Sequence, residues 1–270
     1  DQRLLRGPAV AAVAAAGRSL PGPGRDPRVA ALAETATGLA RDAGVVLPAD
    51  LSLLRWAGTS PPSRRAPAGC RPGEAAAALV AAMEAVLGAD DRRRGAHYTP
   101  DALADEVATR ALAGAAQPTP VVDPACGAGS LLLAAGRHLV ASGEDPAVVA
   151  RQRLWGADIE PLAVAVAEAA IALWSGGTAP EPGHLVVGDP LHHGAGAWPD
   201  PPGGGFEAVV GNPPFQGQLA RATARSAEQT AALRARFGAG LGPYVDTAAL
   251  FLLVGVELAA PGARVAMVQP

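Results

Sequence analysis

The stretch VVGNPPFQGQ, residues 209–218, holds the only asparagine of this 270-residue sequence. Asn212 follows an apolar run and precedes Pro213 and Pro214, whose rings fix φ and restrict the residue before each of them. The side-chain oxygen of Asn212 and the backbone carbonyl of Pro213 could therefore act as two rigid hydrogen-bond acceptors for one amino group. An Asn-Pro pair also starts turns readily, so an ordinary turn is the alternative interpretation.

A second candidate site is the stretch VVDPACGAGSLLLAAG, which reads as a strand, a loop and a helix. Gly127 and Gly129 remove side chains where a backbone must approach a ligand closely, and the helix start near Ser130 presents free N–H groups and a partial positive charge. The third glycine of a dinucleotide-binding motif and the lysine of a phosphate loop are both missing. We predict that this loop holds a cofactor, with a tight strand-to-helix turn as the alternative.

Acidic residues follow the next two apolar runs. Asp158 in WGADIEP could accept hydrogen bonds from both hydroxyls of a ribose, and Asp189 in VVGDPL could accept one from an adenine amino group. Asp158 lies 35 residues after Asp123, a longer separation than the ~20 residues typical of dinucleotide sites. The extra residues fall in ASGEDPAVVARQR. A helix cap is the alternative for each acidic residue taken alone.

These residues lie in a pattern of short apolar strands that alternate with helices. Strands are predicted at 121–122, 154–159, 184–189, 206–211 and 264–269, with helices from Ser130, from Pro161 and over 247–259, and a turn at Pro261-Gly262. Strands that alternate with helices indicate a parallel sheet covered on both faces. The predicted fold is α/β, with a doubly wound, mostly parallel, Rossmann-like sheet.

In such sheets, ligands bind beyond the carboxyl ends of the strands. Asp123, Asp158, Asp189 and Asn212 each come at the end of a predicted strand or within one or two residues of it. We therefore expect all four to line one edge of the sheet.

The first part of the sequence has a different character. Residues 26–45 and 73–87 carry the Ala/Leu/Glu pattern typical of helices, and a Pro/Arg/Gly-rich linker over residues 58–73 separates them. We predict a helical N-terminal region with this linker over residues 1–92.

The composition argues against several classes of protein. The formal net charge of −3 argues against a general polycation, so contact with nucleic acid would need local patches such as Arg92, Arg93 and Arg94. Two cysteines are too few for a disulfide framework, which fits a reducing cytoplasm. The longest apolar run, residues 248–260, is shorter than the ~20 residues that span a bilayer. No membrane segment is expected.

Other candidates have simpler explanations. No metal site is predicted, because the histidines lack ligand spacing and are interpreted as exposed loop residues: His97, His184, His192 and His193. Cys126 has no base beside it and is interpreted as a small packing residue. The polar stretch from Gln216 to Leu241 could contact DNA phosphates or form a solvated helix face, and its arginines are Arg221, Arg225, Arg234 and Arg236.

In this order, GAHYTP, DPACGAGS, ADIEP, GDPL and NPPF resemble the motif series of the γ-class DNA adenine-N6 methyltransferases, which include type I and type IIG enzymes. The resemblance covers residues 93–270 and implies S-adenosyl-L-methionine as the cofactor. It places the methionine end of the cofactor over the glycine loop, the ribose on Asp158 and the adenine near Asp189 and Pro190.

The resemblance implies a set of cofactor-binding residues along these motifs. They are Tyr98, Thr99, Pro100, Asp123, Ala125, Gly127, Gly129, Asp158, Ile159, Asp189 and Pro190. Tyr98, Thr99 and Pro100 should touch the methionine portion. Thr99 and Pro100 also suit the N-cap and the first position of a helix, with Leu103 and Val107 on one face.

The resemblance also implies a role for the NPPF motif, with Asn212, Pro213, Pro214 and Phe215 as catalytic residues. The amino nitrogen of adenine is a poor nucleophile because its lone pair is delocalised into the ring. Acceptors at Asn212 and Pro213 would draw the lone pair out of conjugation and direct it at the methyl group. The target base must be flipped out of double-stranded DNA, and Phe215 could stack on it.

Two alternatives remain at this point: a protein glutamine-N5 methyltransferase, which resembles this sequence in its Asn-Pro-Pro-aromatic motif, and a non-catalytic S-adenosylmethionine-binding fragment. The family fold is expected to have two more strands after the fifth and then a target-recognition domain. Residues 93–270 are therefore interpreted as a methyltransferase core truncated after the fifth strand. The resemblance implies a cytoplasmic enzyme of a restriction-modification or related phage-defence system.

Overall fold

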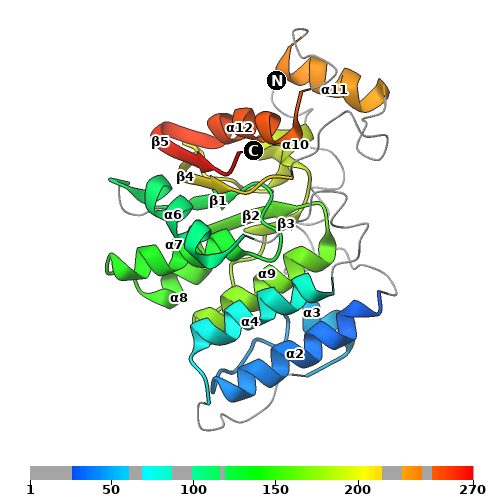
Figure 1. Ribbon diagram of the computed structural model, residues 1–270, viewed down its shortest axis with the longest axis vertical. Helices are drawn as coiled ribbons and strands as arrows, with labels where there is room; N and C mark the ends of the chain where they lie inside the picture. Colours follow the sequence, from blue (N-terminus) through cyan, green and yellow to red (C-terminus); the bar gives the residue numbers. More distant parts are fainter. Residues whose placement is uncertain are drawn as a thin grey trace.

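The computed structural model describes residues 26–60, 69–86, 99–115, 119–214, 227–238 and 245–269. At its centre lies a five-stranded sheet with the order β3-β2-β1-β4-β5, in which every neighbouring pair is parallel (Figure 1). The strands are β1 (Val121–Asp123), β2 (Leu154–Asp158), β3 (Leu185–Val187), β4 (Phe206–Gly211) and β5 (Ala259–Met267). The predicted α/β fold with a mostly parallel sheet is confirmed.

Both faces of the sheet are largely buried at β1–β4, which explains why these strands are mostly apolar runs rather than alternating ones, whereas the edge strand β5 is more exposed. Successive residues of a strand point to opposite faces. Val121 and Val122 accordingly belong to different hydrophobic clusters, as do Leu154 and Trp155. Each strand therefore contributes to two cores, one on either side of the sheet.

Helices cover the two faces separately. The first cluster contains residues of α6 (Asp101–Leu112), α7 (Ser130–Ala141) and α9 (Pro161–Trp174). The second contains residues of α10 (Pro190–His193), α11 (Ala227–Phe237) and α12 (Thr247–Leu258), and the short 3-10 helix η3 (Gly194–Ala197) packs against it. In Figure 1 the sheet lies between these two groups of helices. The helices predicted from Ser130, from Pro161 and from residue 247 are confirmed.

The N-terminal helices form a further layer over α9. They are α2 (Arg28–Asp42), α3 (Ser52–Ala57) and α4 (Pro72–Ala85), and all three contact α9 (Figure 1). Their buried residues belong to the same hydrophobic cluster as those of α6, α7 and the sheet. A buried carboxylate joins the layers, because Oε2 of Glu168 in α9 accepts a hydrogen bond of 2.9 Å from the backbone N–H of Ser52.

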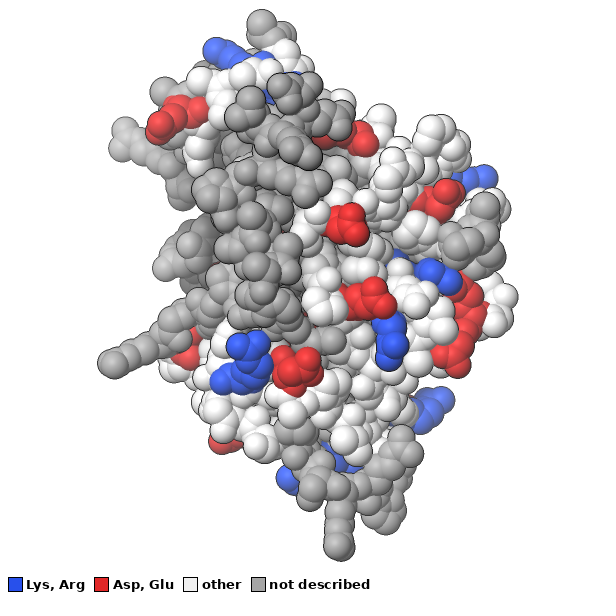
Figure 2. All heavy atoms as spheres, turned by 180° about the vertical axis from the view of Figure 1, so that it is seen from behind, with Lys and Arg blue, Asp and Glu red and all other residues white. Residues whose placement is uncertain are grey.

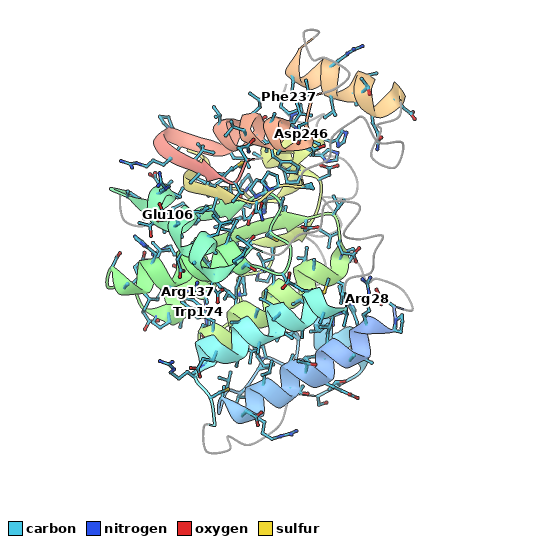
Figure 3. The ribbon with its side chains drawn as sticks, in the orientation of Figure 1. Arg28, Glu106, Arg137, Trp174, Phe237 and Asp246 are labelled. Carbon is cyan, nitrogen blue, oxygen red and sulfur yellow. The ribbon has the colours of Figure 1, made fainter. Side chains whose placement is uncertain are left out.

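Trp174 marks another junction between the layers. It lies at the end of α9, where a Cβ added at Gly136 of α7 would stand 2.8 Å from its ring and one added at Gly73 of α4 would stand 3.9 Å from it (Figure 3). The glycine in α7 therefore allows the indole ring to lie against the helix backbone.

Some elements differ from the sequence prediction. The helix α3 was not predicted, and ASGEDPAVVARQR contains a short helix α8 (Pro146–Val148) and a π-helical turn η2 (Val149–Arg153) before β2. The last strand begins at Ala259 rather than at residue 264, because the predicted Pro261-Gly262 turn lies inside it as an irregularity. There, the register shifts from Phe206 opposite Ala259 to Ala208 opposite Arg264. Gly262 allows this bend with a φ of +88°.

The predicted boundary between residues 92 and 93 lies outside the described residues. Among the helices that the structure does describe, none combines the length and apolar character needed to cross a membrane.

Candidate functional site

Four polar residues follow four neighbouring strands, as the sequence predicts. β2 ends at Asp158 and β1 at Asp123, while Asp189 and Asn212 come one or two residues after β3 and β4. Because the strands are parallel, their carboxyl ends meet at one edge in the order Asp189, Asp158, Asp123, Asn212. The order of the strands reverses between β1 and β4, which is where open α/β sheets bind ligands.

The two glycines of the loop after β1, Gly127 and Gly129, have different surroundings. Gly127 has a φ of +51°, and a Cβ added there would meet nothing within 4 Å, so the space beside it is open. Gly129 has a φ of +92°, and its added Cβ would stand 3.2 Å from the Cβ of Ala167 in α9. Gly129 thus allows α7 to pack on α9, and the ligand-binding role expected for both glycines stays a prediction.

Asp158 holds the glycine loop in place. Its Oδ2 accepts from the N–H of Gly127 and its Oδ1 from the N–H of Glu160, both at 2.9 Å. Burial raises the pKa of this carboxyl and these backbone donors lower it, with burial the larger effect. Each carboxylate oxygen has two lone pairs, so Asp158 can still accept hydrogen bonds from a ligand.

Asp123 is the most deeply buried carboxyl of the edge. The residue is 1% exposed, and Oδ1 accepts from the N–H of Ala125 at 3.0 Å. Burial raises its pKa to about 7, the hydrogen bond from Ala125 opposes the shift, and the negative charge of Asp158 adds to it. A cationic group placed between these carboxylates would stabilise their ionised forms.

Asn212 has one end of its amide engaged and the other end free. Its Nδ2 donates to Oγ1 of Thr99 at 3.0 Å. Its Oδ1 is buried and has no hydrogen-bond partner among the described residues. The preceding residue is fixed to the neighbouring strand, since the carbonyl of Gly211 accepts from the N–H of Val268 at 2.9 Å. The site therefore presents an unpaired acceptor at the end of β4.

Thr99 does not cap α6, contrary to the sequence prediction. The N-cap is Pro100 and the first helical residue is Asp101, so Thr99 lies one residue too early. Its hydroxyl accepts from Asn212 instead. Leu103 and Val107 both lie in α6 at the i and i+4 spacing of one face, where Leu103 is 39% exposed and Val107 is buried.

The expectation of exposed histidines is wrong for His184, whereas His193 is exposed and His192 is half-buried. His184 is buried and its ring stacks on Trp155 with centroids 3.6 Å apart, and burial lowers its pKa to about 4. His192 and His193 lie in α10, where Nδ1 of His192 is 2.7 Å from Oδ2 of Asp189. His97 lies outside the described residues. Within the described ranges, no group of three or more His, Cys, Asp or Glu side chains could hold a metal ion.

The remaining predicted positions are placed as follows. Ile159 is 72% exposed beside Asp158, whereas Pro190 is buried at the start of α10. Pro213 is buried and Pro214 is half-buried. Tyr98 and Phe215 lie outside the described residues, so their roles stay predictions.

Cys126, which directly precedes Gly127 in the glycine loop, is buried, in agreement with a packing role. Burial raises the pKa of its thiol. Gly156 in β2 makes room for it, because a Cβ there would stand 3.0 Å from Sγ of Cys126. The role of Gly156 was not predicted. The signal was present, since a glycine inside a strand marks a close approach by another group.

The structure describes some of the arginines of residues 216–241. Nη2 of Arg236 pairs with Oε2 of Glu257 at 2.5 Å and so joins α11 to α12. Arg236 is therefore committed to packing rather than to a free DNA-facing surface, while Arg221 and Arg225 lie outside the described residues. On the face shown in Figure 2, the described basic and acidic side chains are interspersed rather than separated by sign.

Comparisons with known proteins agree with this geometry. The family model described as N-6 DNA Methylase matches residues 82–270, well over half of the chain. No curated protein matches the chain at significant similarity.

Solved structures share the fold. The type IIG restriction endonuclease BpuSI has a TM-score of 0.58 at 17% identity over 90% of this chain and 31% of its own. A protein from Listeria monocytogenes assigned as a class I S-adenosylmethionine-dependent methyltransferase has a TM-score of 0.50 at 12% identity, over 89% of this chain and 74% of its own.

The chain spans only part of its restriction-enzyme relatives. It covers 39% of a modification subunit from Vibrio vulnificus assigned to a type I restriction enzyme, which has a TM-score of 0.43 at 19% identity over 77% of this chain. With the strand order, the edge residues and the match over residues 82–270 together, the chain belongs to the N-6 DNA methylase family.

Proposed function

We propose that this protein transfers a methyl group from S-adenosyl-L-methionine to the N6 amino group of an adenine flipped out of double-stranded DNA. The observation that carries the proposal is the buried Oδ1 of Asn212 at the end of β4, next to the switch point of the sheet, which has no hydrogen-bond partner in the part of the chain that the structure describes. A buried acceptor without a partner costs stability, so its retention is understandable if a ligand supplies the missing donor.

The residues of the edge fit the cofactor. Asp158 would accept from the ribose hydroxyls, Asp189 and Pro190 would hold the adenine with Ile159 against it, and the open space beside Gly127 would admit the methionine portion. The buried carboxyl of Asp123, with its raised pKa, would favour the cationic amino group of that portion. The bound cofactor supplies a methyl group on a positively charged sulfur.

The chain's own part in the reaction is to hold the amine. Oδ1 of Asn212 and the carbonyl of Pro213 would each accept one N–H of adenine, so that the nitrogen lone pair points toward the methyl group. The proton can leave after the nitrogen becomes cationic, so no strong base is required. Holding the reacting groups in line can supply up to ~7–11 kcal/mol of the barrier reduction, and Phe215 would stack on the flipped base.

The test is the variant Asn212→Ala, assayed with isotope-labelled cofactor. Methyl transfer to DNA should fall by about 100-fold or more, the scale seen when one preorganised polar group is removed. Cofactor affinity, measured by calorimetry, should stay nearly unchanged because Asn212 lies after β4 rather than on the glycine loop. Near-normal turnover in this variant would refute the assigned role.

The substrate class needs a separate assay. Wild-type protein should methylate DNA and leave a release-factor protein unmodified; the reverse result would favour the glutamine methyltransferase, and labelling of neither would favour a non-catalytic subunit. A target-recognition domain downstream, a cytoplasmic location and a place in a restriction-modification or related phage-defence system belong to the same proposal. The match to the N-6 DNA methylase family supports it.

A further inference from the structure

One hydrogen bond connects two motifs that lie far apart in the sequence. Nδ2 of Asn212, just after β4, donates to Oγ1 of Thr99, just before α6, at 3.0 Å and across 113 residues. Thr99 is 6% exposed. The bond is therefore a partly buried contact between the end of a central strand and the start of a covering helix.

The chemistry of a primary amide makes this bond informative. The amide of asparagine has a donor end and an acceptor end of nearly equal size, so its shape alone does not decide which end faces a substrate. The substrate amine needs an acceptor, and a reversed amide would place N–H groups against N–H groups. A fixed partner on the nitrogen side removes this ambiguity, because it leaves the oxygen facing the other way.

The fold holds the Thr99 hydroxyl in position. Pro100 follows it as the N-cap of α6, with φ at −54°, and the carbonyl of Pro100 accepts from the N–H of Ala104 at 2.9 Å. The helix in turn contacts β4 and β5. The hydroxyl thus belongs to the same rigid unit as the strand that carries Asn212.

We propose that Thr99 is a positioning residue, whose hydroxyl orients the Asn212 amide so that Oδ1 faces the substrate amine. This inference rests on the proposed function, and it gives Thr99 a role beyond contact with the cofactor. Thr99→Val removes the hydroxyl at nearly constant shape, whereas Thr99→Ser keeps it. Thr37→Val is a matched control, because Thr37 is also buried and, among the described residues, its hydroxyl donates to carbonyls of its own helix α2, which carries none of the site residues.

The first measurement does not depend on activity. Since Asn212 is the only asparagine, a full chain labelled with ¹⁵N-asparagine shows a single side-chain amide in an NMR spectrum. The two amide protons should be well separated and slow to exchange in wild type, Thr99→Ser and Thr37→Val. In Thr99→Val they should move toward the values of a free amide and exchange faster. An unchanged amide signal in Thr99→Val would overturn the inference.

The second measurement is the rate of methyl transfer to DNA. Thr99→Val should lower kcat by about ten- to a hundredfold, somewhat less than loss of the preorganised group itself, while Thr99→Ser should restore most of the rate and Thr37→Val should leave it unchanged. In an Asn212→Ala background, Thr99→Val should have no further effect on kcat, because a residue that acts only through Asn212 loses its target. An undiminished kcat in Thr99→Val, or an equal loss in both backgrounds, would contradict the positioning role.

The two failures can be told apart. Failure of the proposed function means that wild type methylates no DNA, whatever the state of the amide. Failure of this inference means that wild type methylates DNA and Thr99→Val does so equally well. Equilibrium binding of the cofactor to each variant shows whether any loss instead comes from the cofactor site, in which case Thr99 is a binding residue and the inference is wrong.

Discussion

The carboxyl of Asp123 makes the stability of the ligand-free protein depend on pH. Its pKa of about 7 lies above the ordinary value of 3.8 because of burial. A raised pKa in the folded state stabilises the fold fully at low pH, and that contribution is lost as pH rises through about 7. Asp123→Asn should therefore gain stability relative to wild type between pH 4 and pH 7 and keep the gain above it, measured as the difference in Tm. A constant Tm difference across this range would contradict the assignment.

Cofactor affinity should rise with pH, whereas the stability of the ligand-free protein falls. The ionised Asp123 carboxylate destabilises the empty site but attracts a cationic amino group, so wild-type affinity should rise between pH 6 and pH 8. In Asp123→Asn the same titration, followed by calorimetry, should be much flatter. The neighbouring Asp158, whose pKa burial also raises, remains in both proteins and serves as the internal comparison.

The residues at the strand ends could be predicted because topology determines their positions. Once the strands are parallel, Asp123, Asp158, Asp189 and Asn212 must meet at one edge. The bond between Thr99 and Asn212 could not be predicted, since it depends on where α6 begins relative to β4. His184 was misread for a similar reason, because only the packing of Trp155 shows that this histidine is buried.

At the scale of elements, the strand-to-helix connection after β1 needs its two glycines for different reasons. Both lie in the left-handed region, where any other residue costs roughly 1–2 kcal/mol. Gly129 also borders Ala167, so Gly129→Ala requires this packing contact with α9 to yield slightly. Gly129→Ala should lower the free energy of unfolding by about 2–4 kcal/mol, and Gly127→Ala by about 1–2 kcal/mol.

For cofactor affinity, we expect the opposite order, with Gly127→Ala weakening binding more than Gly129→Ala. An added methyl group at Gly127 occupies open space at the loop, whereas one at Gly129 points into the helix packing. Denaturant titration and calorimetry of the pair test both rankings. Equal stability losses would show that the packing against Ala167 is unimportant, and equal cofactor affinities would show that the open space beside Gly127 is not the ligand site.

At the scale of the whole molecule, the N-terminal helices stabilise the methylase core. Every residue of α9 from Leu162 to Leu173 is buried, so this helix needs cover on the side away from the sheet as well. α2, α3 and α4 provide that cover and share one hydrophobic cluster with the sheet. A helix that is apolar all round does not stay soluble when one side is uncovered. The two regions that the sequence suggests should therefore unfold together.

Glu168 is the residue with which to test that coupling. Its carboxylate accepts from the N–H of Ser52, and both residues are buried. Glu168→Ala leaves that N–H without this partner, at a cost of about 1–3 kcal/mol. Trp56 in α3 and Trp155 in the sheet can report on the two regions, and the unfolding midpoints that they give should fall by the same amount. Glu106→Ala, at a residue labelled in Figure 3, is the control, because its exposed pair with Arg110 should contribute less than about 1 kcal/mol. A transition in which the Trp56 signal changes first, while the Trp155 midpoint stays at its wild-type value, would show that the N-terminal helices are an independent unit.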